Sequence, residues 1–312
     1  MSDKNPYVEH ISVGIIQTTV DPDVAWQKNA SSPQMSESED NHVWAEVCNA
    51  LRAFQDDREN PRLILLPELS LPRTRLDDFE RILGSLNAVA VVGVDYLLNH
   101  DNRIVRNEGI VFVPRNFFED HPSRRCTRIR FGKTYPAPKE NKKLQEMNPQ
   151  WSFEGDSNVY VFDAQEFGRF GVAICWDIMD VERSLMYRGQ VQHLFVLAYN
   201  RDLETFRSLA NSLSRTVFCN LVICNTGFYG GSLVVSPYYM PHQRTLYEHN
   251  GSRLFTTQVV KLPVRDLITA QCRSENIDQS GGDSGLFKNP PPGFFERAQL
   301  LRQRVDLTRE RG

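Results

Sequence analysis

Three segments of the sequence carry residues that together could perform nucleophilic catalysis by a thiol. Cys175 ends the apolar run in GVAICWD, Glu68 lies in LILLPELS, and Lys133 lies in RFGKTYPAPKE. A thiol is a weak nucleophile at neutral pH, so covalent catalysis needs a base that accepts its proton and a positive charge that holds the anion formed next. Glu68 and Lys133 are of the right types for these two roles.

The segments that hold these residues read as parts of an α/β domain. Strands are predicted at the β-rich apolar runs HISVGIIQ, RLILLPE, AVAVVGVDYLL, EGIVFVP, RCTRIRFGK, HLFVLA, LVICNTG and SLVVSP. Helices are predicted where apolar residues recur at helical spacing, at NHVWAEVCNALRAF, RLDDFERILGSL, VERSLMYRG and LETFRSLANSLSRTVF. Because strands and helices alternate, the sequence predicts a layered α/β domain with buried sheets. The polar stretch NASSPQMSESED is predicted to be a mobile loop.

Length and charge favour one large domain that acts on a small molecule. The chain has 312 residues, and its net charge of −3 comes from 36 basic and 39 acidic residues. That balance gives no overall field for nucleic acid or an anionic membrane. The sequence has no apolar run of about 18 residues and no basic-then-apolar start. We therefore expect a soluble, cytoplasmic protein that binds neither nucleic acid nor membrane.

The cysteines indicate neither a metal centre nor a disulfide framework. The six stand at positions 48, 126, 175, 219, 224 and 272, with no C-x-x-C pair and no regular spacing. Reduced thiols are expected, with no metal and no cofactor. Cys219 and Cys224 flank the strand LVICN and are predicted to fill the core, and His193 is predicted to be a hydrogen-bonded residue at the start of a strand.

The composition changes near residue 275. Beyond that point SENIDQSGGDSGLFKNPPPG is rich in Gly, Ser and Pro, which continue neither sheet nor helix. We therefore predict a domain over residues 1–275 and a linker with a C-terminal tail over residues 276–312. FFERAQLLRQRV keeps helical spacing only in part, so the tail is either a helix that contacts another protein or a disordered segment.

Five elements in order resemble the signature of the nitrilase superfamily, the carbon-nitrogen hydrolases, over roughly residues 8 to 272. LILLPE, RFGKTYPAPKE and FGRFGVAICWDIMDVE are similar to the glutamate, lysine and cysteine segments of that family. Ser214-Arg215 with Asn220 and the turn Gly230-Gly231-Ser232 are similar to its later elements. The resemblance implies a four-layer α-β-β-α sandwich and homo-oligomers built by packing one sandwich on another.

The resemblance also implies roles for the site residues. Glu68 would accept the Cys175 proton and return it to the leaving amine, while Lys133 would stabilise a Cys175 thiolate. Lys133 and the backbone N–H of Trp176 would hold the oxyanion. A thioester would form and water would release it. Asp177 would brace the loop.

A second glutamate is expected near Lys133. Glu140, seven positions after Lys133, matches the family spacing, and Glu146 and Glu154 are the alternatives. The second glutamate would either orient Lys133 or hydrogen-bond the substrate and the attacking water.

The substrate is less well defined than the nucleophile. Members of the family hydrolyse amides, N-carbamoyl (ureido) compounds or nitriles, and some transfer the acyl group to an amine. Amides and N-carbamoyl compounds are preferred here over nitriles. Phe228 and Tyr229 are expected to line the site. Arg73 and Arg75 either face the pocket, which would favour an acidic or phosphate-bearing substrate, or lie on the surface. A binding or assembly module that keeps the fold without catalysis is the alternative from another class.

Overall fold

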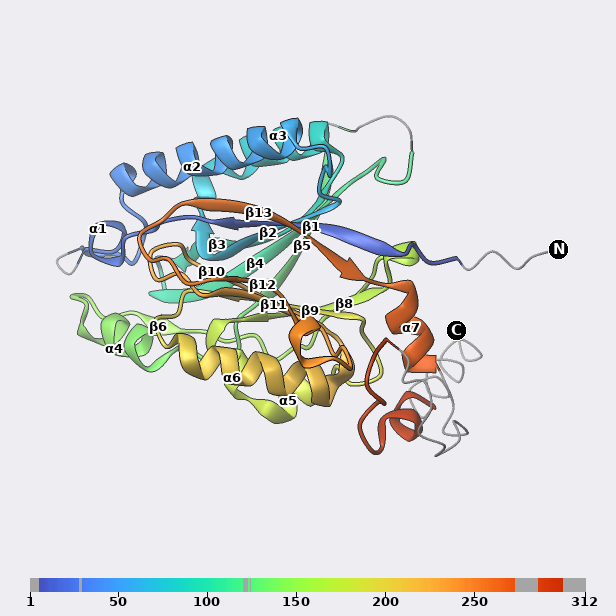
Figure 1. The fold of residues 1–312 in the computed structure, drawn as a ribbon. Coiled ribbons are helices and arrows are strands. Elements are labelled where there is room, and N and C mark those ends of the chain that lie inside the picture. The colour runs from blue at the N-terminus through green and yellow to red at the C-terminus, as the bar shows by residue number, and fades with distance from the viewer. Residues whose placement is uncertain (1–5, 28–29, 120–122, 124, 273–285, 300–312) are drawn as a thin grey trace, which may run out of the picture.

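The strands of the chain form two sheets that lie face to face (Figure 1). The computed structural model describes residues 6–27, 30–119, 123, 125–272 and 286–299. The first sheet has the order β13-β1-β2-β3-β4-β5 with β6 paired to β4, and the second has the order β12-β11-β10-β9-β8-β7. The strands are β1 His10–Gln17, β2 Leu63–Leu71, β3 Val89–Asn99, β4 Ile104–Pro114, β5 Cys126–Gly132, β6 Ser152–Phe153, β7 Val161–Asp163, β8 Arg169–Ile174, β9 His193–Ala198, β10 Asn220–Asn225, β11 Ser232–Val235, β12 Thr245–His249 and β13 Thr256–Pro263.

Helices cover the outer face of each sheet. Figure 1 shows α2 and α3 over the first sheet and α5 and α6 over the second. The α-helices are α1 Pro22–Ala25, α2 Glu37–Asp56, α3 Leu76–Leu86, α4 Pro138–Glu146, α5 Val181–Leu185, α6 Leu203–Leu213 and α7 Arg265–Cys272. Short 3₁₀ or π turns are η1 Arg73–Arg75, η2 Gln165–Phe167, η3 Cys175–Met179, η4 Ser214–Phe218 and η5 Pro241–Gln243. The four-layer α-β-β-α sandwich is therefore confirmed. No helix among the described residues is both long and apolar enough to cross a bilayer.

The sandwich explains why β2 reads as a continuous apolar run. Leu63 and Leu65 pack between the sheets with side chains of the second sheet. Ile64 and Leu66 point the other way and pack with side chains of α2 and α3. Both faces of β2 are thus buried, as is usual for parallel strands covered by helices.

The predicted polar loop before α2 is partly wrong. Its last residues form the first turn of the helix, which begins at Glu37. Ser36 caps this turn because its hydroxyl accepts a hydrogen bond from the Glu39 N–H at 3.3 Å. A serine followed three residues later by a glutamate before an apolar run is a helix start, so the polar composition reflects capping here.

Two bulges side by side interrupt the first sheet where the site lies. Between β2 and β3 the pairing jumps from Leu66 with Val92 to Leu71 with Val94, so the segment that contains Glu68 loops out. Between β3 and β4 the register shifts again beside Val94, at Tyr96 and Asn107. Bulges re-aim side chains near functional sites, and these two turn Glu68, Tyr96 and Asn107 toward one spot.

Gly93 allows β3 to approach the Glu68 bulge. A Cβ at Gly93 would lie 2.2 Å from the Pro67 carbonyl oxygen and 2.4 Å from the Glu68 Cα. Both contacts are to backbone, which cannot move aside without displacing Glu68. We expect Gly93→Ala to lower the free energy of unfolding by about 3 kcal/mol, at the upper end for overpacking. Urea denaturation measures this change, and an unchanged unfolding midpoint would show that the bulge adapts.

The described part of the C-terminal tail packs on its own domain. Phe287 and Phe294 are buried in a small cluster with Phe218 and Leu267, and the Phe287 ring stacks on Tyr238 at 4.7 Å. Residues 294–299 are helical. The predictions for residues 276–285 and 300–312 lie outside the described residues. Contact with another protein stays a prediction for the tail.

Candidate active site

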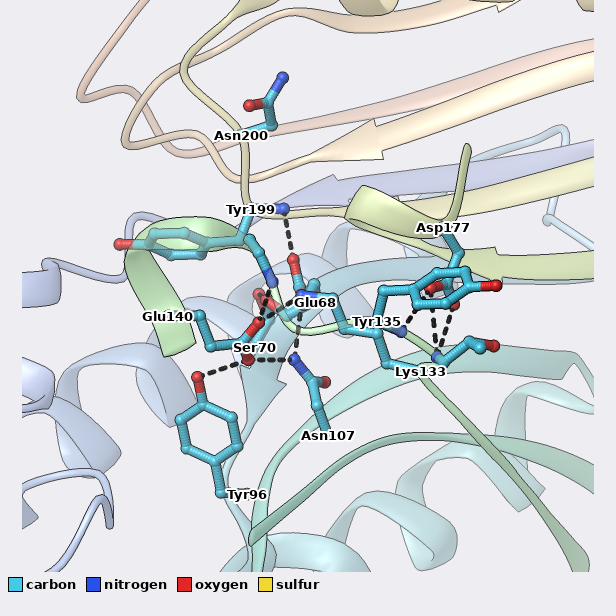
Figure 2. A network of polar contacts seen from close by, with 12 residues as sticks. Glu68, Ser70, Tyr96, Asn107, Lys133, Tyr135, Glu140, Asp177, Tyr199 and Asn200 are labelled. Carbon is cyan, nitrogen blue, oxygen red and sulfur yellow. Dashed lines mark hydrogen bonds and ion pairs between the residues drawn. The ribbon is translucent and has the colours of Figure 1, made fainter. Parts of the chain in front are cut away.

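Lys133 lies between two glutamates in the interior. It follows β5, and its side chain is 1% exposed. Its Nζ donates to Glu68 Oε1 at 2.8 Å and to Glu140 Oε2 at 2.6 Å (Figure 2). Burial alone would lower the pKa of Lys133, but the charges of Glu140 and Glu68 raise it well above its usual value. Lys133 is therefore a fixed cation.

Glu140 has no acceptor position left for a further ligand. Its Oε2 accepts from Lys133 Nζ and from the Ala137 N–H at 3.0 Å, and its Oε1 accepts from Tyr96 Oη at 2.8 Å and Asn107 Nδ2 at 3.0 Å. A carboxylate has about four acceptor positions, so all are used. Burial opposes the charged form, but Lys133 and the other donors hold the pKa of Glu140 below its usual value. Its contacts suit a group that orients Lys133.

Glu68 keeps one acceptor position open. Oε1 accepts from Lys133 Nζ and from Asn107 Nδ2, both at 2.8 Å. Oε2 accepts the Tyr199 N–H at 3.0 Å. Among about four acceptor positions, the remaining one is on Oε2, and the Cys175 thiol is within hydrogen-bonding reach of Glu68. Of the two glutamates, only Glu68 can therefore accept a proton from the thiol.

Cys175 lies at the turn from β8 into η3. Its φ of 46° is in the left-handed region, which is uncommon for a residue with a side chain and is often found at functional sites. Burial and the charge of Glu68 raise its pKa well above the usual value, although Lys133 and the Tyr199 N–H act in the opposite direction. Burial thus favours the neutral thiol, and the stabilisation of a thiolate by Lys133 stays a prediction.

Asp177 ties the nucleophile turn to the segment after Lys133. Its carboxylate accepts the N–H groups of Thr134 and Tyr135 at 3.0–3.1 Å (Figure 2). Burial raises the pKa of Asp177 to about 6, against the lowering effect of these two N–H groups. The neighbouring Trp176 N–H lies in the first turn of η3, where N–H groups lack partners within the helix. These contacts match the bracing expected of Asp177.

The other predicted residues separate into near and distant groups. The Tyr229 ring packs edge-on against the Tyr199 ring, with their centroids 5.5 Å apart. The Phe228 ring packs against the Tyr229 ring at 5.1 Å, so Tyr229 lies between Phe228 and Tyr199. Glu146 and Glu154 are largely exposed and pair with Lys142 and Arg106, away from Lys133. Glu140 is thus the second glutamate that contacts the lysine.

The two arginines after Glu68 are engaged elsewhere. Arg73 donates to the Tyr96 carbonyl oxygen at 2.8 Å and pairs with Glu108 at 3.1 Å. Arg75 pairs with Asp40 at 2.9 Å near the surface. Neither contacts the Glu68, Lys133 and Cys175 cluster in these interactions, so they give no support for an acidic substrate.

Sequence reasoning missed Tyr96, Asn107 and Tyr199. Tyr96 stands inside the apolar run AVAVVGVDYLL, Asn107 directly precedes the run EGIVFVP, and Tyr199 contributes its main-chain N–H. The interruption of the apolar pattern by Asn and Glu in VRNEGIVFV was the available signal for Asn107.

A small cavity lies beside Glu140. Its lining includes Trp26, Gln27, Tyr96 and Lys143 and does not include Cys175. Within the described residues, no group of three or more His, Cys, Asp or Glu side chains is arranged to hold a metal ion.

Solved structures similar in fold to this chain include members of the nitrilase superfamily and an amidase. Nit3 of Saccharomyces cerevisiae, a member of branch 10 of that superfamily, is 15% identical with a TM-score of 0.56, and the alignment covers 89% of this chain and 99% of Nit3. A mutant of the amidase from Nesterenkonia sp. AN1, with a glutamate replaced by leucine, carries the acetamide moiety of fluoroacetamide covalently added at its active-site cysteine. It is 14% identical with a TM-score of 0.57, over 84% of this chain and 94% of the amidase.

A third match is XC1258 from Xanthomonas campestris, a CN-hydrolase superfamily protein with an arsenic adduct in its active site. It is 11% identical with a TM-score of 0.52, over 81% of this chain and 91% of XC1258. No protein-family model and no curated protein matches the sequence. This chain has the fold of the nitrilase superfamily, and the resemblance read from its sequence is confirmed at that level.

Proposed function

We propose that the protein is a thiol hydrolase that cleaves a non-peptide carbon-nitrogen bond through a thioester on Cys175. One observation carries this proposal. A buried carboxylate, Glu68, has a single open acceptor position within reach of the Cys175 thiol, and both stand beside the ammonium of Lys133. A base, a nucleophile and a cation in this order are what acyl transfer to a thiol requires.

The first half of the reaction forms the thioester. Glu68 Oε2 takes the proton of Cys175 as Sγ bonds to the carbonyl carbon of the substrate, so the thiolate need not exist beforehand. The electron pair of the carbonyl moves to oxygen, where Lys133 Nζ and the Trp176 N–H stabilise the negative charge. When the carbon-nitrogen bond breaks, Glu68 gives its proton to the departing nitrogen.

The second half returns the site to its starting state. Glu68 takes a proton from water as the water oxygen bonds to the thioester carbon. The carbon-sulfur bond then breaks, a carboxylic acid leaves, and the proton returns to the Cys175 sulfur. Glu140 stays outside this transfer, because its acceptor positions are all filled, and holds Lys133 in place.

Amides and N-carbamoyl compounds are the proposed substrates, ahead of nitriles. The similarity in fold to the amidase from Nesterenkonia sp. favours an amide. A homo-oligomer, a cytoplasmic location and the lining roles of Phe228 and Tyr229 stay predictions from the sequence.

A substrate screen tests the proposal. Amides, ureido acids and nitriles are offered in turn, and ammonia release is measured with Cys175→Ala as the blank. Ammonia from amides or ureido acids, absent from the blank, is the expected result. Hydroxylamine or an amine added in competition with water separates hydrolysis from acyl transfer, and transfer to one specific amine in preference to water would overturn the hydrolase assignment. Absence of any Cys175-dependent turnover would favour a non-catalytic module.

Replacing the base tests the role of Glu68. Glu68→Gln keeps the size of the side chain but cannot accept the thiol proton, so we expect kcat to fall by about 10²–10⁴-fold. Glu146→Gln is the matched control, because Glu146 is exposed and pairs only with Lys142 on the same helix. Steady-state kinetics on the best amide measure both. Equal activity of the two variants would remove Glu68 from the mechanism.

A further inference from the structure

Asn107 joins three members of the polar cluster at once. It is 1% exposed and lies in the bulge between β3 and β4. Its Nδ2 donates to Glu68 Oε1 at 2.8 Å and to Glu140 Oε1 at 3.0 Å (Figure 2). Its main-chain oxygen accepts the Lys133 N–H at 2.9 Å. Asn107 therefore holds the side chains of both glutamates and the main chain of the lysine.

Charge sets the orientation of the Asn107 amide. Both groups that face the amide nitrogen are carboxylate oxygens, so a turned amide would place Oδ1 against two anions. In the orientation observed, Oδ1 is buried and has no hydrogen-bond partner in the structure described. A buried unpaired acceptor is unfavourable. The fold tolerates it because the opposite end makes two hydrogen bonds to charged groups, which are stronger than neutral ones.

These bonds determine which oxygen of Glu68 faces the thiol. Asn107 and Lys133 fill both positions of Oε1, which leaves the open position on Oε2. Without the Asn107 amide, the carboxylate could turn about its last bond, because such sp³–sp² torsions are soft. The base would then spend less time directed at Cys175.

We propose that Asn107 is a positioning residue, which holds the carboxylates of Glu68 and Glu140 next to each other and turns Glu68 Oε2 toward Cys175. This inference rests on the proposed function of the same site. Asn107 has no role in bond making or breaking, and it acts through the two carboxylates.

A change in pH dependence follows from this role. The groups that face Glu68 are Lys133 after β5, Glu140 on α4, Cys175 at η3, Tyr96 on β3 and Tyr199 after β9. Loss of the amide donor disfavours the charged form of Glu140, because one of its four hydrogen-bond donors is removed. Glu140 then binds a proton more readily, so the acid limb of the rate profile moves to higher pH.

The test uses alkylation of Cys175, which needs no substrate. Iodoacetamide is reacted with the full chain over a range of pH, and peptide mapping follows the rate at Cys175. Asn107→Leu, which is close to Asn in size, is expected to slow the reaction by about 10²-fold and to move the acid limb upward by about one pH unit. With an amide substrate the loss should fall on kcat, with KM unchanged.

Asn220→Leu is the matched control. Asn220 is also fully buried, and its Nδ2 also donates twice, to His193 at 3.1 Å and to the Pro263 carbonyl oxygen at 2.8 Å, but it lies away from the cluster. The Asn220→Leu variant should be less stable than the wild-type protein and keep the wild-type pH profile of alkylation. If Asn107→Leu does not fold, Asn107→Ser is expected to show the same shift.

The experiment distinguishes failure of the proposed function from failure of the positioning role. Wild-type Cys175 that does not react would contradict the proposed function and, with it, this inference. Wild-type Cys175 that reacts, together with an Asn107 variant that is folded and has the wild-type rate and pH profile, would overturn the positioning role alone.

Discussion

Cys175→Ala is expected to abolish turnover of every amide or ureido substrate that the wild-type protein accepts. Loss of a catalytic nucleophile lowers kcat by about 10⁶-fold in a well-studied hydrolase, and a loss of that order is expected here. The open acceptor position of Glu68 would then have no thiol to deprotonate. Steady-state ammonia release from the best amide measures the effect.

Cys219→Ala and Cys224→Ala are the controls for Cys175→Ala. Both thiols are 0% exposed in the core, and burial raises their pKa as it does for Cys175. Neither has a carboxylate among the groups that shift its pKa. Their removal should lower stability by cavity formation and leave kcat near its wild-type value. Appreciable activity in Cys175→Ala would mean that another group forms the intermediate.

Lys133→Met is expected to cause the largest loss of stability. The substitution leaves the carboxylates of Glu68 and Glu140 buried and close together without a cation. Removal of one partner from a buried ion pair lowers the free energy of unfolding by about 3–5 kcal/mol. Catalysis should also be lost, because the oxyanion then lacks its charged donor. Urea denaturation measures the change in stability.

The pH dependence of the stability of Lys133→Met shows whether the loss of stability comes from charge. Without Lys133 one carboxyl has a raised pKa in the folded state, so it binds its proton more tightly when folded than when unfolded. Stability is then greatest at low pH and falls as pH rises through the raised pKa. The difference from wild type should therefore shrink as pH falls. Lys142→Met, an exposed control paired with Glu146, should change stability little at any pH. A loss in Lys133→Met that does not depend on pH would point to packing instead of charge.

The catalytic residue types and the position of the strand before Glu68 could be predicted from the sequence, but its end could not: the apolar pattern predicts an end at Pro67, and β2 continues to Leu71. LILLPE reads as a buried strand because its side chains alternate between two apolar layers, and the alternation of strands and helices predicts the layered domain. The four-layer order came from the family resemblance, since periodicity does not say which face a sheet presents. The start of α2 was missed because capping residues and loop residues have the same composition.

The wider site could not be predicted, because it depends on how the strands pair. Glu68, Tyr96 and Asn107 meet only where two register shifts fall side by side. No local pattern in the sequence marks a bulge in an apolar run. The burial of the Cys175 thiol could not be predicted either, since the sequence shows the nearby cation and not the depth of burial.

The most direct test of the central claim is the site of covalent attachment. Fluoroacetamide is incubated with the wild-type protein, with Glu68→Gln and with Cys175→Ala, and intact mass and peptide mapping locate the adduct. In a mutant of the amidase from Nesterenkonia sp., in which a glutamate is replaced by leucine, the acetamide moiety of this reagent is found on the active-site cysteine. We predict one acetamide moiety on Cys175 of the wild-type protein and none at that position in Cys175→Ala. Attachment to the exposed Cys272 with Cys175 unmodified would contradict the account.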